Sequence, residues 1–137
     1  MLTLSRTVTF SAAHRLFSPD LSQNENARIF GKCSSPGGHG HNYSLTVTVA
    51  GDVDPATGMI MNVSDLTQLI STHVLERFDH RDLNNVPCLE GKTTTMENII
   101  RVIADLLAPP LHNLGVALHR LELKESTATT VTLECHD

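Results

Sequence analysis

The sequence contains no tryptophan, one tyrosine and four phenylalanines, so aromatic residues make up only 4% of its 137 positions. Hydrophobic residues nevertheless account for 40% of the chain. At this length one domain can bury a substantial core. We therefore expect a single domain over residues 1–137, with a core built mainly from leucine, isoleucine, valine and methionine.

Long apolar stretches are also missing. No segment approaches the roughly 18 consecutive apolar residues that a membrane-spanning helix needs, and the N-terminus lacks the charged start and apolar run of a secretory signal. The three cysteines are expected to be free thiols rather than a disulfide framework. These features predict a cytoplasmic protein with no membrane partner.

Basic residues are not in excess. Ten lysines and arginines against fifteen acidic residues give a formal net charge of −5. Nucleic-acid binders usually carry a basic surplus, and no run of like charge suggests a polybasic patch. The composition therefore predicts no nucleic-acid partner.

Strands are predicted where apolar and polar residues alternate. Such alternation occurs at residues 2–14, 39–50, about 115–125 and 129–135. The segment 15–38 between the first two shows no clear period and predicts a long loop. Loops of that length in small domains tend to be functional.

Apolar residues at helical spacing predict two helices between the strand pairs. The first begins near Asn62 or Ser64, and the second opens at Thr94 and is ended by Pro109-Pro110. The order strand, strand, helix, helix, strand, strand predicts an α+β domain, with a four-stranded antiparallel sheet and both helices on one face. Exposed sheet edges favour pairing between subunits, so we expect a homo-oligomer.

Three of the eight histidines have an informative placement. His39 and His41 alternate on a predicted strand, so their side chains face the same way, with Cα atoms ~7 Å apart. His14 ends the neighbouring predicted strand on its apolar side and offers a third nitrogen. Three imidazoles with an open position are typical of a catalytic zinc site. Hydrogen-bonded histidines at a sheet end are the alternative, and the pattern alone leaves both open.

Cys33 lies six residues before His39, in a segment rich in glycine and serine. It is a candidate fourth ligand, a candidate nucleophile or base, or an inert small residue. As a thiolate it is suited to accepting a proton. Cys88 and Cys135 are interpreted as packing residues.

Several other polar positions have competing interpretations. Asp79 beside His80 is either a proton relay or the solvated end of a helix. Glu97 follows Thr94 at the spacing of a capping box, which gives it a structural role. Glu125 ends a predicted strand and either lies in water or points inward, where a carboxylate pairs with a guanidine-like ligand edge.

Together these segments resemble the 6-pyruvoyl tetrahydropterin synthase family over nearly the whole chain. The resemblance is carried by motifs at residues 10–16, 30–43, 54–59, 79–84 and 95–98, followed by Glu125. It implies the tunnelling fold, in which ββααββ subunits form trimeric barrels that pair into a hexamer. It also implies 7,8-dihydroneopterin triphosphate as substrate and 6-pyruvoyl tetrahydropterin as product.

The same resemblance implies roles for individual residues. The ligands of Zn²⁺ would be His14, His39 and His41. The base would be Cys33, assisted by Asp79 and His80 from a neighbouring subunit. The pterin ring would be anchored by Glu125, in a pocket also lined by Glu97 and Thr95.

Five residues separate Cys33 from His39, which matches the pyruvoyl-forming branch of the family. The 6-carboxytetrahydropterin synthases of queuosine biosynthesis usually have a shorter spacing. Two alternatives stay open: the carboxy-type reaction on the same substrate, and a non-catalytic, zinc-stabilised pterin-binding module in which Cys33 would be dispensable.

Overall fold

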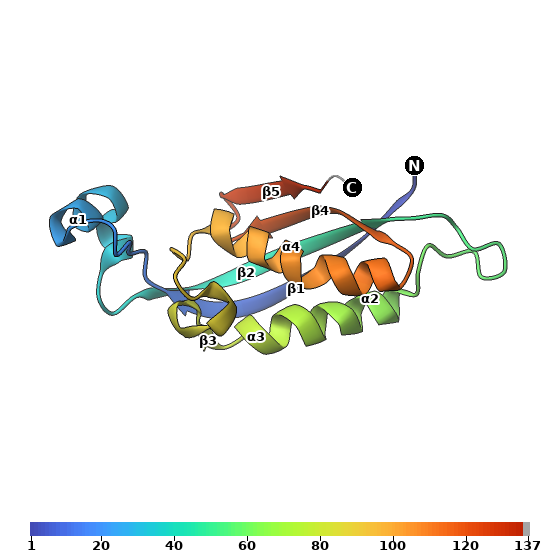
Figure 1. The fold of residues 1–137 in the computed structure, drawn as a ribbon, viewed down its shortest axis with the longest axis horizontal. Coiled ribbons are helices and arrows are strands. Elements are labelled where there is room, and N and C mark those ends of the chain that lie inside the picture. Colours follow the sequence, from blue (N-terminus) through green and yellow to red (C-terminus); the bar gives the residue numbers. More distant parts are fainter. Residues whose placement is uncertain (136–137) are drawn as a thin grey trace.

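A five-stranded sheet forms the centre of the computed structural model, which describes residues 1–135 (Figure 1). The strand order is β3-β1-β2-β4-β5. Strands β1 (Thr3–His14) and β2 (His39–Ala50) are antiparallel neighbours, and β4 (Ala117–Lys124) and β5 (Thr130–Glu134) continue the antiparallel pattern. The predicted four-stranded antiparallel sheet is therefore confirmed.

The fifth strand, β3 (Arg81–Asp82), was not predicted. It pairs in parallel with Ala12 and Ala13 of β1. A strand of two residues is too short to show alternation in the sequence. It forms because the chain after the first helical segment returns to the edge of β1.

The first predicted helix is a continuous helical segment. It consists of α2 (Val63–Ile70), a π-helical stretch (Ser71–Leu75) and α3 (Glu76–Phe78). Asn62 is the N-cap, and its side chain accepts a hydrogen bond from the Ser64 amide. The segment buries one side, formed by Leu66, Leu69, Ile70, Val74 and Phe78.

The second helix, α4 (Met96–Asn113), starts differently from the prediction. Its N-cap is Thr95, whose hydroxyl accepts from the Asn98 amide. The predicted capping box of Thr94 and Glu97 is therefore wrong. Thr94 is buried. Glu97 is exposed and does not have the capping role that the spacing suggested.

Pro109 and Pro110 do not end α4, which corrects a second prediction. Proline removes a backbone donor and disfavours the helix interior, yet tertiary packing supplies most helical stability. Leu107 and Leu111, four residues apart on one side, are both fully buried. Packing of Leu111 holds the last turn in place.

The predicted long loop at 15–38 contains a helix, α1 (Gln23–Phe30). Ser22 and Glu25 form a capping box at its start, which is a local signal in the sequence. The helix has no apolar stripe, and Asn26 is its one buried residue. A prediction based on hydrophobic period therefore could not find it.

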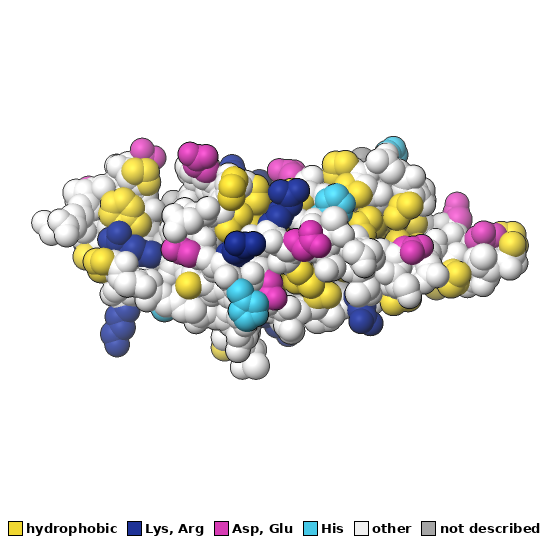
Figure 2. All heavy atoms as spheres, turned by 90° about the horizontal axis from the view of Figure 1, so that it is seen from below, with side chains coloured by type: hydrophobic (Ala, Val, Ile, Leu, Met, Phe, Trp, Pro, Cys, Tyr) yellow, Lys and Arg dark blue, Asp and Glu magenta, His cyan; other side chains and the backbone are white. Residues whose placement is uncertain are grey.

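The core lies between the sheet and the helices α2, α3 and α4, which cover one face of the sheet in Figure 1. Acidic and basic side chains are interspersed on the side of the molecule drawn in Figure 2. Among residues 1–135, no helix combines the length and apolar character needed to span a bilayer.

Candidate metal centre

Three histidines meet where the end of β1 lies beside the start of β2. The antiparallel register pairs His14 with His39 and Ala12 with His41, so the three histidines share the core-facing side. One ligand nitrogen from each lies within 4.8 Å of the others. The structure thus brings together the three histidines that the sequence singled out.

The protonation form of His14 follows from its surroundings. The side chain is buried, and Nδ1 lies 2.8 Å from the carbonyl oxygen of Thr94. A carbonyl only accepts, so Nδ1 carries the hydrogen and Nε2 keeps its lone pair. Burial lowers the pKa of His14, and His39 and His41 lower it further, against the opposing effect of the Thr94 bond. The surroundings of His14 thus favour its uncharged form, in which Nε2 carries the lone pair that a metal binds.

The spacing of the nitrogens also fits a metal ion. The Nε2 atoms of His14 and His39 lie 3.1 Å apart. Two nitrogens bound at ~2.05 Å to a tetrahedral zinc are ~3.3–3.4 Å apart. His39 and His41 are only partly buried, so the cluster is accessible from outside. The donor set suits Zn²⁺ or a similar transition metal.

Glu125 and Tyr43 flank the cluster. Of its two predicted orientations Glu125 adopts the inward one, with Oε2 3.8 Å from His41 Nε2. Tyr43 is fully buried and stacks on Phe10 at 5.0 Å between ring centroids. Its hydroxyl has no hydrogen-bond partner among the described residues. Burial raises the pKa of Tyr43, and the Glu125 charge adds to the effect, so the phenol keeps its proton.

Cys33 lies in a 3-10 turn (Gly31–Ser34) just before β2 and is partly buried. Within residues 1–135, its thiol does not belong to the group of close ligand atoms. This geometry does not support the fourth-ligand interpretation and leaves the thiol available for other chemistry.

Asp79 and His80 follow α3 and are anchored to β1 rather than simply solvated. The Ser11 amide donates to Asp79 Oδ1 at 2.9 Å, and the His80 amide donates to the Ser11 carbonyl at 2.7 Å. His80 has φ 58°, which is uncommon for a residue other than glycine. Its side chain is 83% exposed and lies 3.8 Å from Asp79 Oδ2. Neither residue is part of the histidine cluster of its own chain.

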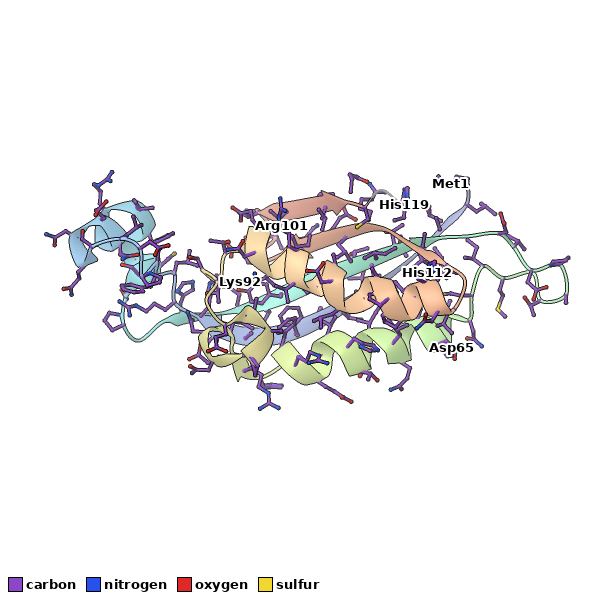
Figure 3. The ribbon with its side chains drawn as sticks, viewed as in Figure 1. Met1, Asp65, Lys92, Arg101, His112 and His119 are labelled. Atoms are coloured by element: carbon purple, nitrogen blue, oxygen red, sulfur yellow. The ribbon has the colours of Figure 1, made fainter. Side chains whose placement is uncertain are left out.

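The start of α4 lies against the cluster, because the carbonyl of Thr94 accepts a hydrogen bond from His14. Thr95 is the next residue after this point of contact. Figure 3 places two other histidines, His112 and His119, toward the end of the molecule that holds the N-terminus. They belong to α4 and β4 and take no part in the cluster.

Two residues at this site were not singled out by sequence reasoning. The Asn84 side chain accepts from the Arg15 amide at 2.7 Å and donates to the Arg15 carbonyl at 2.9 Å. Both residues belong to motifs of the family resemblance, which was the only signal available. Their contact joins positions 69 residues apart, so no local pattern reveals it.

An α+β domain with an accessible cluster of three imidazoles defines a candidate metalloenzyme. The sequence profile of the 6-pyruvoyl tetrahydropterin synthase family matches residues 3–135. The chain belongs to this family, whose members are lyases, and the tunnelling fold predicted for the subunit is confirmed.

Individual relatives agree. The human 6-pyruvoyl tetrahydrobiopterin synthase is 47% identical over 105 residues, covering 76% of this chain and 72% of that protein. The Dictyostelium discoideum enzyme of the same name is 40% identical over 124 residues, covering 90% of each. The solved structure of Caenorhabditis elegans 6-pyruvoyl tetrahydropterin synthase superposes with a TM-score of 0.86 at 34% identity, covering 98% of this chain and 96% of that one.

These relatives favour the pyruvoyl-forming reaction over the carboxy-type alternative, because each carries the pyruvoyl-forming name. Membership in a lyase family likewise disfavours the non-catalytic binding module.

Proposed function

We propose that this chain is a zinc-dependent lyase that converts 7,8-dihydroneopterin triphosphate to 6-pyruvoyl tetrahydropterin with elimination of triphosphate. The observation that carries the proposal is the cluster of His14, His39 and His41, whose ligand nitrogens lie within 4.8 Å of one another. It occurs in a chain of the 6-pyruvoyl tetrahydropterin synthase family.

The three histidines would hold the metal. Bound there, Zn²⁺ supplies Lewis-acid polarisation of the substrate's side-chain hydroxyls. The protein contributes three imidazoles and leaves room for an exchangeable ligand, the arrangement typical of catalytic zinc. The hydrogen bond between His14 and Thr94 supports this role because it keeps Nε2 unprotonated.

Cys33 would act as the base. As a thiolate it would remove the proton from the first side-chain carbon of the substrate, while the ring nitrogen of the adjacent C=N bond takes a proton. The resulting enol becomes a ketone at that carbon as the neighbouring ring carbon is protonated, so the ring is reduced at the expense of the side chain. Removal of the proton from the second side-chain carbon then breaks the carbon–oxygen bond between the third carbon and triphosphate and leaves an enol. Tautomerisation then yields the pyruvoyl side chain. The role is supported by the place of Cys33 beside the strand end that carries His14, outside the group of close ligand atoms.

Asp79 and His80 would assist proton transfer in the site of a neighbouring subunit, within a homohexamer built as a dimer of trimers. In one chain the His80 ring is 83% exposed, and its backbone is held at φ 58°. A side chain presented outward in an uncommon conformation suits a role in another subunit. The exposed sheet edges support assembly.

Glu125 would accept two hydrogen bonds from the guanidine-like edge of the pterin, with Glu97 and Thr95 lining the same pocket. Its support is the inward orientation of Glu125, 3.8 Å from His41. We place the enzyme in the cytoplasm, where thiols such as those of Cys33 and Cys88 stay reduced.

Product analysis tests the reaction. Purified zinc-loaded enzyme is incubated with 7,8-dihydroneopterin triphosphate, and we expect equimolar triphosphate and 6-pyruvoyl tetrahydropterin. Formation of 6-carboxytetrahydropterin with acetaldehyde would refute the assignment. The metal is tested by zinc analysis: His41→Ala should lose most of its zinc, whereas the control His112→Ala, from the exposed end of α4, should keep it. Full zinc occupancy in His41→Ala would exclude the proposed ligand set.

A further inference from the structure

The turn that carries Cys33 is tied to the residues that directly follow His14. Arg15 Nε donates a hydrogen bond to the Ser34 carbonyl at 2.6 Å. The next backbone amide, that of Leu16, donates to the Cys33 carbonyl at 2.8 Å. Two consecutive residues after a metal-ligand position thus hold two consecutive carbonyls of the turn.

Arg15 is itself held firmly. Its guanidinium carbon lies 4.6 Å from the centroid of the Phe17 ring, and stacking restricts the plane of the group. Both backbone polar groups of Arg15 bond to the Asn84 side chain, at 2.7 and 2.9 Å. The Thr94 hydroxyl also donates to the Arg15 carbonyl at 3.4 Å. The guanidinium is therefore a fixed donor rather than a freely moving surface side chain.

The far end of the same segment also meets β1. Gly38 has φ +67°, and a Cβ there would lie 2.9 Å from the His14 carbonyl oxygen. The segment from Cys33 to Gly38 therefore contacts residues 14–16 at both ends. Of these contacts, only the hydrogen bond from Arg15 to the Ser34 carbonyl is made by a long side chain. A substitution of Arg15 can therefore remove this contact without altering the backbone.

We propose that Arg15 is a positioning residue that sets the place of the Cys33 thiol relative to the three histidines. The proposal rests on the proposed function, in which Cys33 removes a proton. A base acts only within hydrogen-bond reach of the proton that it removes. A displacement of about 1 Å can therefore slow the reaction about 100-fold while the metal and the pterin still bind.

The alternative role for Arg15 is direct contact with the triphosphate of the substrate. The two roles differ in what they change. Loss of a charge contact made equally in the ground and transition states raises KM and leaves kcat unchanged. Loss of positioning lowers kcat and leaves KM and zinc content unchanged.

Steady-state kinetics of Arg15→Gln separate these roles. We expect kcat to fall about 10- to 100-fold, with KM and zinc content within about twofold of wild type. Arg15→Lys should lie between, because an ammonium can reach the carbonyl but cannot stack as a planar group. Arg28→Gln, an exposed arginine in α1, is the matched control and should match wild type. A raised KM at unchanged kcat, or loss of zinc, would overturn the proposal.

A double-mutant cycle tests whether Arg15 acts through Cys33. If it does, Arg15→Gln should cause no further loss in a Cys33→Ala background. An equal loss in both backgrounds would refute the coupling. Cys33→Ala with wild-type turnover would instead show that the assigned base is wrong, a distinguishable failure of the proposed function.

Amide hydrogen exchange gives a readout independent of catalysis. In Arg15→Gln, exchange in residues 31–38 should accelerate while exchange in the centres of β1 and β2 stays at the wild-type rate. Unchanged exchange in residues 31–38 would show that Arg15 does not hold the turn.

Discussion

The Nδ1 atom of His14 lies 2.8 Å from the carbonyl oxygen of Thr94, although 80 residues separate them in the sequence. Thr94 directly precedes the N-cap of α4. This hydrogen bond ties the metal centre to the start of the helix. It also selects the tautomer of His14, because the carbonyl accepts only from a protonated Nδ1.

The first prediction concerns the cap of α4. Thr95→Ala removes the hydroxyl that accepts from the Asn98 amide, and we expect the free energy of unfolding to fall by about 1 kcal/mol. Glu97→Ala, two residues away and exposed, should change it by less than about 0.5 kcal/mol. Chemical denaturation measures both. A larger loss in Glu97→Ala would support the capping role that the spacing suggested.

The second prediction concerns pH. Burial holds the pKa of His14 below its ordinary value of 6.5, so at lower pH the unfolded chain binds a proton that the folded chain does not. This contribution to stability is complete above about pH 6.5 and is lost as the pH falls toward the folded pKa. The zinc-free protein should therefore lose stability as the pH falls below about 6.5.

Denaturation curves of three zinc-free proteins check the assignment to this residue. His14→Gln should show a smaller loss of stability over that range than wild type, because its buried side chain does not titrate. His112→Gln, which changes an exposed histidine, should follow wild type. An unchanged pH dependence in His14→Gln would contradict the prediction.

The third prediction compares two neighbouring glycines. Gly38 has φ +67°, and an added Cβ would lie 2.9 Å from the His14 carbonyl oxygen, whereas a Cβ at Gly37 would meet nothing within 4 Å. Gly38→Ala should cost about 1–3 kcal/mol of stability and reduce zinc occupancy, because Gly38 directly precedes His39. Gly37→Ala should leave both close to wild type. Thermal unfolding and zinc analysis test the pair, and equal behaviour of the two variants would count against this account.

The fourth prediction concerns sites shared between subunits. Cys33→Ala and His80→Ala should each be nearly inactive as pure oligomers. When the two are unfolded together and refolded, random pairing should restore about a quarter of the wild-type activity. Wild-type subunits carried through the same procedure give the reference value. No recovery in the mixed sample would mean that both residues serve the same chain's site.

Much of the fold was determined by the sequence itself. Alternation with a period of two places His39, His41 and Tyr43 on one side of a strand whatever packs against it. That periodicity was sufficient to predict β1, β2 and the last strand pair. Helical spacing was likewise sufficient for the buried side of α2 and α3, because the stripe of apolar residues must face the sheet.

The tertiary structure decided what no local period encodes. Helix α1 has no apolar stripe, and the end of α4 depends on packing of Leu111 rather than on the two prolines before it.

The polar contacts around the site have the same origin. Thr94 holds His14, Asn84 clamps Arg15, and Arg15 holds the turn of Cys33. The first two contacts join residues 80 and 69 positions apart, and the tertiary arrangement of the chain is what brings their donors and acceptors into contact. A buried polar group must find a partner, but only the packed chain determines which partner lies within reach.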